Sequence, residues 1–395
     1  MDERIKKLRQ KIDKIDAKII NLLDTRAKIA KKIYEIKRQS NMTSFDPFRE
    51  HEKIIFVEQN IKVFPKSSAK HIFVEIFSGT RKLYEDIKVG FLGPEGSFSW
   101  EAALKVFGQS CIFLPLTNIE DIFEATEKFL CNYGVVPLEN SRDGIVGETL
   151  DLLVEKKVKI VYEISVPVSF SLLSMSDDIS KIKRIYSHQK AIAQCSRWIR
   201  ENLKNAEVIY TSSTSEGARL ASEDPEGSAI SPERLSQKYN LKVLFSNIQD
   251  SYGERTEFIV IRKEDEYDNE YKEYRKEDKP VLKDKGRTIL NLNKQHYFES
   301  DKIFFGRSSD IREAFCFSVK DEPGALYRVL EPLAQNKINM KKIHSRPDKI
   351  TKRYNFFVEI ERKHGDDKKI QSAFEKISKN ITFFKTLGVY AFRRD

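Results

Sequence analysis

Cysteine is scarce in this sequence of 395 residues, and its placement argues against the two kinds of site that depend on it. A zinc site needs clustered ligands, and a disulfide framework needs regularly spaced pairs, but neither CxxC nor CxxH spacing occurs. Scattered thiols are typical of a reducing compartment, so we expect a cytoplasmic protein without a bound metal. The four cysteines are Cys111, Cys131, Cys195 and Cys316.

Long apolar runs are also missing. No stretch approaches the roughly 18 consecutive apolar residues of a membrane-spanning helix. The charged opening MDERIKKLRQKIDKID lacks the apolar centre of a secretory signal. We therefore expect no membrane partner and no export.

Positive charge is in excess, with a net charge of +10, but it is unevenly distributed. Residues 1–86 hold 20 Lys and Arg against 13 Asp and Glu, a net charge of +7. Such an excess fits a solvated helical surface, a basic pocket for a small polyanion, or a nucleic-acid site. No RNP, zinc-finger or basic-zipper pattern accompanies the charge, so we expect no nucleic acid as a partner.

The first segment, residues 1–87, has the apolar periodicity of a long helix. Its apolar residues are spaced by threes and fours, and neither glycine nor proline occurs before Pro47. This pattern predicts one helix of roughly 50 Å with a coiled-coil-like seam, followed by shorter helices over about 47–62 and 67–85. The seam residues are Ile5, Leu8, Ile12, Ile15, Ile19, Leu22, Ile29, Ile33 and Ile36.

Arg26 occupies the one seam position that is not apolar. A polar residue there either sets the register of a helix pair or offers a desolvated guanidinium to a carboxylate. Lys37 shares the face of Arg26 about 16 Å further along, so both side chains can reach one small ligand. Arg9 lies about 42 Å from Lys37 by the same helix rise, and it would have to serve such a site from a second chain.

Residues 88–262 alternate short strands with helices, which indicates an α/β domain. We expect strands at VGFLG, YGVVPLEN, IVYEISVPVSFSLL, RIYSH, AEVIYTS, SAIS, KVLFS and FIVIR. The glycine-rich stretch GPEGSFS (93–99) matches neither a P-loop nor a dinucleotide-binding fingerprint. It lies between a strand and a helix N-terminus, a place suited to holding an anion.

Residues 263–310 are polar and read as an insertion or linker. Regular patterns return over 311–395, where the expected order of elements is βαββαβ. That order predicts a small α+β domain of the ferredoxin-like type.

The first segment resembles the all-helical chorismate mutase domain, through LRQKIDKIDAKIINLLDTRAKIAKKIYEIK and the following SFDPFRE. In that family two chains interleave their long helices, and each active site borrows an arginine from its partner. The resemblance implies that Arg9 is the borrowed arginine and that Arg26 and the catalytic Lys37 bind the substrate carboxylates and ether oxygen. Further substrate-binding positions implied are Asp46, Arg49, Glu50, Thr80 and Tyr84, of which Tyr84 stands where Gln or Glu is usual.

The second segment resembles prephenate dehydratases through YGVVPLENSRDGIV, YSHQKAIAQCSRW, TSSTSEGAR and ERTEFIVI, in that order. The family fold is two α/β lobes around a cleft, similar to periplasmic binding proteins, with the second lobe inserted in the first. The resemblance implies that Thr256 is the catalytic hydroxyl that assists the departing OH, and that the 93–99 loop receives a carboxylate. The other implied cleft residues are Ser97, Ser99, Glu139, Asn140, Gln194, Ser213 and Phe258, whereas His188 is expected to be structural.

The dehydratase motif departs from the family pattern at its centre. Thr-Arg-Phe is here Thr256-Glu257-Phe258, and Glu254 replaces a usual Asn. In a strand, Thr256 and Phe258 would share one face while Glu257 points away and could pair with Arg255. Two alternatives therefore stay open beside a prephenate dehydratase: a cleft that binds without turnover, and an arogenate dehydratase.

The third segment resembles the ACT domain that follows these dehydratases and binds phenylalanine. The resemblance rests on GAL at Gly324, Ala325 and Leu326, on Asn339, and on His344-Ser345-Arg346, where His344 replaces a glutamate. Taken together, the three resemblances imply a bifunctional chorismate mutase/prephenate dehydratase with a phenylalanine effector. They imply chorismate and prephenate as substrates, no cofactor, and a homodimer or higher homo-oligomer.

Overall fold

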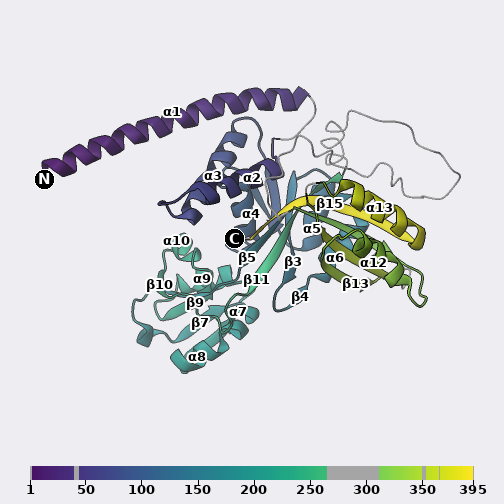
Figure 1. The fold of residues 1–395 in the computed structure, drawn as a ribbon. Coiled ribbons are helices and arrows are strands. Elements are labelled where there is room, and N and C mark those ends of the chain that lie inside the picture. The colour runs from purple at the N-terminus through teal and green to yellow at the C-terminus, as the bar shows by residue number, and fades with distance from the viewer. Residues whose placement is uncertain (1, 40–43, 265–310, 349–352, 364, 395) are drawn as a thin grey trace.

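The computed structural model describes residues 2–39, 44–264, 311–348, 353–363 and 365–394 (Figure 1). Nearly all of the predicted 263–310 linker therefore lies outside the described residues. Within the described part of the chain, no helix is long and apolar enough to cross a bilayer.

Three helices form the N-terminal part, as predicted: α1 (Glu3–Gln39), α2 (Pro47–Asn60) and α3 (Lys66–Lys82). Asp46 caps α2 by accepting a hydrogen bond from the backbone N–H of Arg49 at 3.1 Å. α2 and α3 pack through a small apolar cluster of Ile54, Val74 and Phe77. No residue of α1 is buried, and Figure 1 shows this helix stretched over the body with its N-terminal end extending beyond it.

The first α/β lobe contains two parallel strand pairs and a returning antiparallel strand. β1 pairs in parallel with β2 and β3, and β11 runs antiparallel between β3 and β5. The strand at IFLPL was not predicted. The elements are β1 (Lys88–Leu92), α4 (Phe98–Phe107), β2 (Ile112–Leu116), α5 (Ile119–Glu127), β3 (Tyr133–Asn140), β4 (Gly144–Ile145), α6 (Gly147–Glu155), β5 (Val158–Pro167) and β11 (Arg255–Lys263).

The second lobe is inserted between β5 and β11 and has its own five-stranded sheet, of order β10-β6-β9-β7-β8. It is the teal region beneath the first lobe in Figure 1. Its elements are β6 (Ser171–Ser174), β7 (Arg184–Ser187), α7 (Gln189–Gln194), α8 (Ser196–Asn202), β8 (Glu207–Tyr210), α9 (Thr214–Ala221), β9 (Gly227–Ser231), α10 (Leu235–Tyr239) and β10 (Lys242–Phe245).

The chain crosses between the lobes at 168–170 and again at 246–254. We predicted a single strand through IVYEISVPVSFSLL, and this was wrong. β5 ends at Pro167, β6 begins at Ser171, and they belong to different sheets. Proline has no N–H to continue the ladder. The next amide, that of Val168, donates instead to the carbonyl oxygen of Glu254 at 2.8 Å, which ties the two crossovers together.

The C-terminal part has the predicted βαββαβ order and continues the sheet of the first lobe. β15 pairs with β12 on one side and in parallel with β5 on the other, from Ala391–Tyr162 to Arg394–Ser165. One ten-stranded sheet, with β13 at one edge, thus runs through both domains, an arrangement that no local pattern predicts. The elements are β12 (Ile311–Ser318), α12 (Ala325–Gln335), β13 (Met340–Pro347), β14 (Tyr354–Glu361), α13 (Asp367–Ile377) and β15 (Phe383–Arg394).

Candidate active sites

A cavity of about 750 Å³ lies between α1, α2 and α3. Its wall is apolar along α1 and α3 and charged where α1 faces the start of α2. Seven of the eight residues expected at the first site line it, and only Arg9 is not among them. These seven are Arg26, Lys37, Asp46, Arg49, Glu50, Thr80 and Tyr84.

The two expected cations reach this cavity from the same side of α1. Arg26 donates to the hydroxyl of Thr80 at 2.8 Å and lies 5.2 Å from the centre of the Phe77 ring. Burial lowers the pKa of Arg26, although nearby Glu50 opposes this effect. The ammonium group of Lys37 is 3.2 Å from Asp46, the residue that caps α2. Two cations are therefore placed over one cavity, which Arg49, Lys53 and Arg81 also line.

Glu50 lies at the bottom of the cavity against Arg81, a residue that the sequence analysis did not select. The two form an ion pair, and a second guanidinium nitrogen of Arg81 donates to the carbonyl oxygen of Phe107 at 2.8 Å. Burial raises the pKa of Glu50, while Arg81 acts in the opposite direction. Arg81 thus links the cavity to α4 of the neighbouring lobe. In the sequence, only the position of Arg81 next to Thr80 indicated that it could belong to this site.

Tyr84 lines the cavity, whereas Arg9 lies far from it. The ring of Tyr84 stacks on Tyr34 with centroids 5.0 Å apart, and its hydroxyl donates to the carbonyl oxygen of Ala27 at 2.8 Å. The hydroxyl of Tyr84 is thus engaged by α1. Arg9 precedes Arg26 on the same helix by about 25 Å of helix rise, far from the cavity of its own chain.

The second site centres on Thr256 and Asn140, which are partners in the register of β11 and β3. The side-chain amide of Asn140 donates to the Thr256 hydroxyl oxygen at 2.8 Å. Its carbonyl oxygen accepts the backbone N–H groups of Arg142 at 2.9 Å and Asp143 at 3.1 Å, which fixes the direction of the amide. A hydroxyl that accepts such a bond keeps its own proton free to donate, and any negative charge on its oxygen is stabilised.

The serines around this site also serve the local fold. Ser97 caps α4 by accepting from the Trp100 N–H at 3.2 Å, and Ser213 caps α9 by accepting from the Glu216 N–H at 3.1 Å. His188 caps α7 in the same way, which agrees with its expected structural role. Ser99 in α4 and Gln194 at the end of α7 are both buried.

The 93–99 loop rests on the second lobe. Arg234 donates to the carbonyl oxygens of Gly96 at 3.0 Å and Ser97 at 2.8 Å, and Ser215 donates to that of Glu95 at 2.8 Å. Gly96 has a φ of +94°, and a Cβ there would lie 2.3 Å from Leu235. Only glycine fits this conformation and this space, so the loop is built to contact the opposite lobe.

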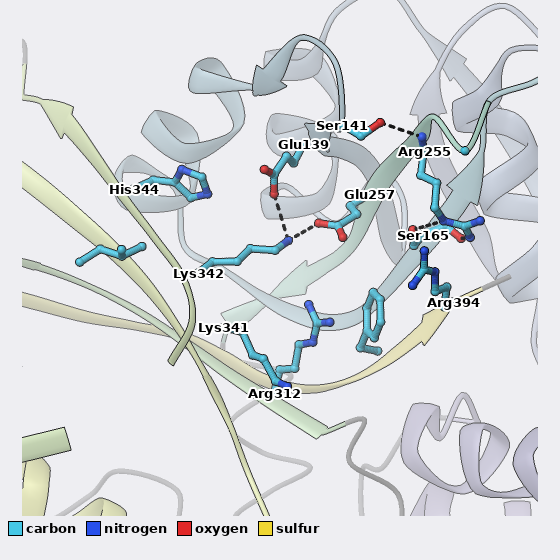
Figure 2. Close-up of a pocket in the computed structure, with 13 residues that line it drawn as sticks. Glu139, Ser141, Ser165, Arg255, Glu257, Arg312, Lys341, Lys342, His344 and Arg394 are labelled. Carbon is cyan, nitrogen blue, oxygen red and sulfur yellow. Dashed lines mark hydrogen bonds and ion pairs between the residues drawn. The ribbon is translucent and has the colours of Figure 1, made fainter. Parts of the chain in front are cut away.

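Alternate residues of β11 face different parts of the molecule, as predicted. Thr256 and Phe258 are buried, whereas Arg255 and Glu257 are half-buried on the other side. Phe258 is 2 % exposed and belongs to the core, so it supports Thr256 from within the lobe. Glu257 forms an ion pair with Lys342 of β13, and the guanidinium of Arg255 donates to Ser165 (Figure 2).

Glu139 shares this other side of the sheet. It is the register partner of Glu257 and lies 3.2 Å from Lys342. The structure therefore separates Glu139 from Asn140, although they are neighbours in the sequence. The motif alone could not reveal this, since it does not show which side of β3 meets the next domain.

The residues expected at the third site are divided between two faces of β13. His344 and Arg346 turn toward the dehydratase lobe, where Arg346 pairs with Asp151 of α6, while Ser345 is exposed. Asn339 donates to Glu361 at 2.9 Å. Gly324 is the N-cap of α12 and has a φ of +76°, and Ala325 and Leu326 are in the first turn of this helix.

Comparison with known families matches all three parts of the chain in order. The profile of chorismate mutase type II matches residues 8–85, that of prephenate dehydratase matches 89–266, and that of the ACT domain matches 315–379. The matched ranges contain the two sites and β13.

Relatives and solved structures agree with these matches. The bifunctional chorismate mutase/prephenate dehydratase of Aquifex aeolicus is 38% identical over 98% of this chain and 98% of its own. The protein of the same name from Neisseria gonorrhoeae is 30% identical over 99% of this chain and 98% of its own. A prephenate dehydratase structure from Arthrobacter aurescens in complex with L-Phe has a TM-score of 0.60 and 27% identity, covering 77% of this chain and 90% of that one.

Proposed function

The chain belongs to the family of bifunctional chorismate mutase/prephenate dehydratases, and we propose a role for each residue at its two sites. Its N-terminal domain rearranges chorismate to prephenate. Its two-lobed domain converts prephenate to phenylpyruvate, in phenylalanine biosynthesis. The observation that carries the second assignment is the 2.8 Å hydrogen bond from Asn140 to Thr256.

In the mutase site, Arg26 and Lys37 hold the two carboxylates and the ether oxygen of chorismate. The rearrangement is pericyclic and transfers no proton, so orientation and charge carry the catalysis. Lys37 stabilises the negative charge that develops on the ether oxygen as the C–O bond breaks. Asp46 and Glu50 accept from the ring hydroxyl, with Arg49, Thr80 and Tyr84 completing the wall. Arg81 holds Glu50 in place.

The mutase works as a dimer in which Arg9 enters the site of the partner chain. Two observations support this proposal. Arg9 is too far from the cavity of its own chain, and the apolar seam of α1 is exposed along its whole length. Leu8 is 58 % exposed, Leu22 67 % and Ile36 65 %, and such a stripe needs a second helix to cover it.

In the dehydratase site, Thr256 donates its proton to the departing hydroxyl of prephenate. The ring carboxylate leaves as CO2, its bonding electrons enter the ring, the hydroxyl departs as water, and a proton from solvent then restores the Thr256 hydroxyl. Asn140 stabilises the charge left on the Thr256 oxygen, which is how a weakly acidic hydroxyl can act as the proton donor. Ser97, Ser99, Gln194 and Ser213 line the cleft, and Phe258 supports Thr256 from the core. We assign Glu139 to the opposite side of the sheet.

The ACT domain binds phenylalanine as an effector. The complex of the Arthrobacter dehydratase with L-Phe supports this proposal. Gly324, Ala325, Leu326, Asn339 and Ser345 contact the amino acid. His344 and Arg346, which face the dehydratase lobe, carry the signal.

We also place the protein in the cytoplasm, because its four cysteines are free thiols. We assign prephenate, rather than arogenate, as the second substrate because the same chain produces it.

One experiment tests both activities. Purified protein is given chorismate, and prephenate and phenylpyruvate are followed together, with Thr256→Ala as the control; arogenate is offered separately. We expect phenylpyruvate from the unmutated chain and prephenate alone from the variant. Prephenate accumulating with the unmutated chain would show that the cleft binds without turnover. A preference for arogenate would identify the alternative dehydratase.

A further inference from the structure

Two departures from the family pattern meet in one pocket. Glu257 stands where an arginine is usual, and His344 stands where a glutamate is usual. Both line a cavity of about 680 Å³ between the dehydratase lobe and β13 of the ACT domain (Figure 2). A positive charge is thus replaced by a negative one on the dehydratase side, and a negative charge is lost on the ACT side. The second change offsets part of the first, because replacing Arg with Glu alters the charge by −2 and replacing Glu with neutral His alters it by +1.

Lys342 extends from β13 to the centre of this charge arrangement. Its ammonium group pairs with Glu257 and lies 3.2 Å from both Glu139 and Glu163. These carboxylates come from β11, β3 and β5, which are three adjacent strands of the dehydratase sheet. Figure 2 shows the lysine side chain reaching between Glu139 and Glu257.

The surrounding carboxylates favour the charged form of Lys342. Lys342 is 17 % exposed, and Glu163 is fully buried. Burial opposes a charged lysine, but Glu163, Glu359 and Glu257 together outweigh it and raise the pKa of Lys342. Removing the lysine would leave Glu257 and Glu139 without their shared cation, a costly state in a partly buried place, whereas Glu163 would keep its ion pair with Arg312 at 3.1 Å.

The residues that Lys342 holds are next to the reacting pair. Glu257 follows Thr256 in β11, and Glu139 precedes Asn140 in β3. In the register of the two strands, Thr256 is opposite Asn140 and Glu257 is opposite Glu139. The distance between Asn140 and Thr256 therefore depends on the same two strand segments that the lysine clamps on their reverse side.

We propose that Lys342, a residue of the ACT domain, is a positioning residue of the dehydratase. It holds β3 and β11 at the spacing that lets Asn140 polarise Thr256, so the ACT domain completes the dehydratase site. This inference rests on the proposed roles of Thr256 and Asn140. It also gives Glu257 a function, since the carboxylate is bound by Lys342 and faces away from the cleft.

The test compares Lys342→Met with Lys341→Met in the full-length protein. Lys341 is the neighbouring lysine, and its pair, 3.2 Å away, is Glu361 within the ACT domain. Steady-state kcat and KM for prephenate are measured beside the mutase rate of the same preparation. We expect Lys342→Met to lower the dehydratase kcat by about ten- to hundredfold, the scale of a small misplacement of catalytic groups. We expect an unchanged mutase rate, and no change in either activity for Lys341→Met.

Three further measurements separate positioning from a general loss of structure. The prephenate KM should change much less than kcat, and Lys342→Arg, which keeps the charge, should recover most of kcat. Glu257→Gln removes the ion pair between Lys342 and β11 but leaves Glu139 and Glu163 to bind the lysine. We expect this variant to lower kcat as well. If Glu257 instead repelled substrate, this variant would raise activity, and the inference would fail.

The remaining outcomes are equally decisive. An active dehydratase that is insensitive to Lys342→Met would overturn this inference alone. An unmutated chain that makes no phenylpyruvate would overturn the assigned roles of Thr256 and Asn140 and the inference together. If Lys342→Met loses the mutase rate as well, this variant has failed to fold. The dehydratase kcat of Glu257→Gln then decides whether the inference holds.

Discussion

Arg346 of the ACT domain and Asp151 of the dehydratase lobe form a two-bonded ion pair, with nitrogen–oxygen distances of 3.2 and 2.8 Å. Gly147, which begins the same helix as Asp151, leaves room for the guanidinium: a Cβ there would lie 2.3 Å from Arg346. The pair connects β13 to α6, the helix that follows the strand of Asn140. It is a direct contact from the effector domain to that part of the dehydratase, in addition to the contact of Lys342 with Glu139.

Asp151→Asn should therefore weaken feedback more than catalysis. Without the carboxylate the bidentate pair is lost, and the phenylalanine concentration for half-maximal inhibition should rise about tenfold, equivalent to roughly 1.4 kcal/mol of coupling. The rate without phenylalanine should stay close to that of the unmutated chain. Glu148→Gln, an exposed change on the same helix, is the control. Equal inhibition of both variants would show that the pair is only structural.

Mixed dimers should recover mutase activity that neither parent has. Arg9→Ala and Arg26→Ala each disable both sites of a homodimer. A mixed dimer has one site with Arg26 from its own chain and Arg9 from the partner. Random mixing should restore about a quarter of the unmutated activity, because half of the dimers are mixed and each has one intact site. If the mixture shows only the sum of the two parents, Arg9 does not act across the interface.

Removing the donor beside Thr256 should disable only the dehydratase. Asn140→Asp keeps the size of the side chain but cannot donate to the hydroxyl when ionised. Loss of one such preorganised donor typically lowers kcat by about 10²–10³. We expect that loss in phenylpyruvate formation with no change in prephenate formation from chorismate. Asn202→Asp, on the exposed surface of α8, should leave both rates intact.

Acid should destabilise the junction between the mutase helices and the dehydratase sheet. His51 of α2 is buried there, 3.1 Å from the Tyr162 hydroxyl of β5. Burial, and secondarily Arg393, lower the pKa of His51 to about 4. The unfolded chain takes up this proton below pH 6.5 and the folded chain only near pH 4. Above pH 6.5 His51 is neutral in both states, and the folded protein keeps its full stability. As the pH falls toward 4, protonation of the unfolded chain lowers the free energy of unfolding by up to about 3 kcal/mol.

The measurement is the midpoint of urea unfolding between pH 7 and pH 4. His51→Gln removes the titrating group, and its midpoint should change less with pH than that of the unmutated chain. His71→Gln, at an exposed position of α3, should behave like the unmutated chain. An identical pH dependence in all three proteins would rule out His51 as the cause.

The sequence predicted features with a local signature. The seam of α1 follows from a 3.6-residue period, and the burial of Thr256 and Phe258 on one side of β11 follows from a period of two. Pairings between distant elements leave no such signature. Lys342 meets Glu257 across 85 residues of sequence, and Arg81 meets Glu50 across 31. Either contact depends on a register that is known only once the strands and helices are assembled.

The four residue pairs that join β15 to β5 determine which motions the enzyme can use. A parallel strand pair cannot slide gradually, because a shift of one residue turns every side chain to the opposite face. The ACT domain and the first lobe are therefore held in one fixed register at these strands. We expect an effector signal that passes from Arg346 to Asp151 to affect the catalytic cleft at the crossovers of 168–170 and 246–254, by changing how far the second lobe rotates. Inhibition would thus change the opening and closing of the cleft, while Thr256 keeps its position within the first lobe.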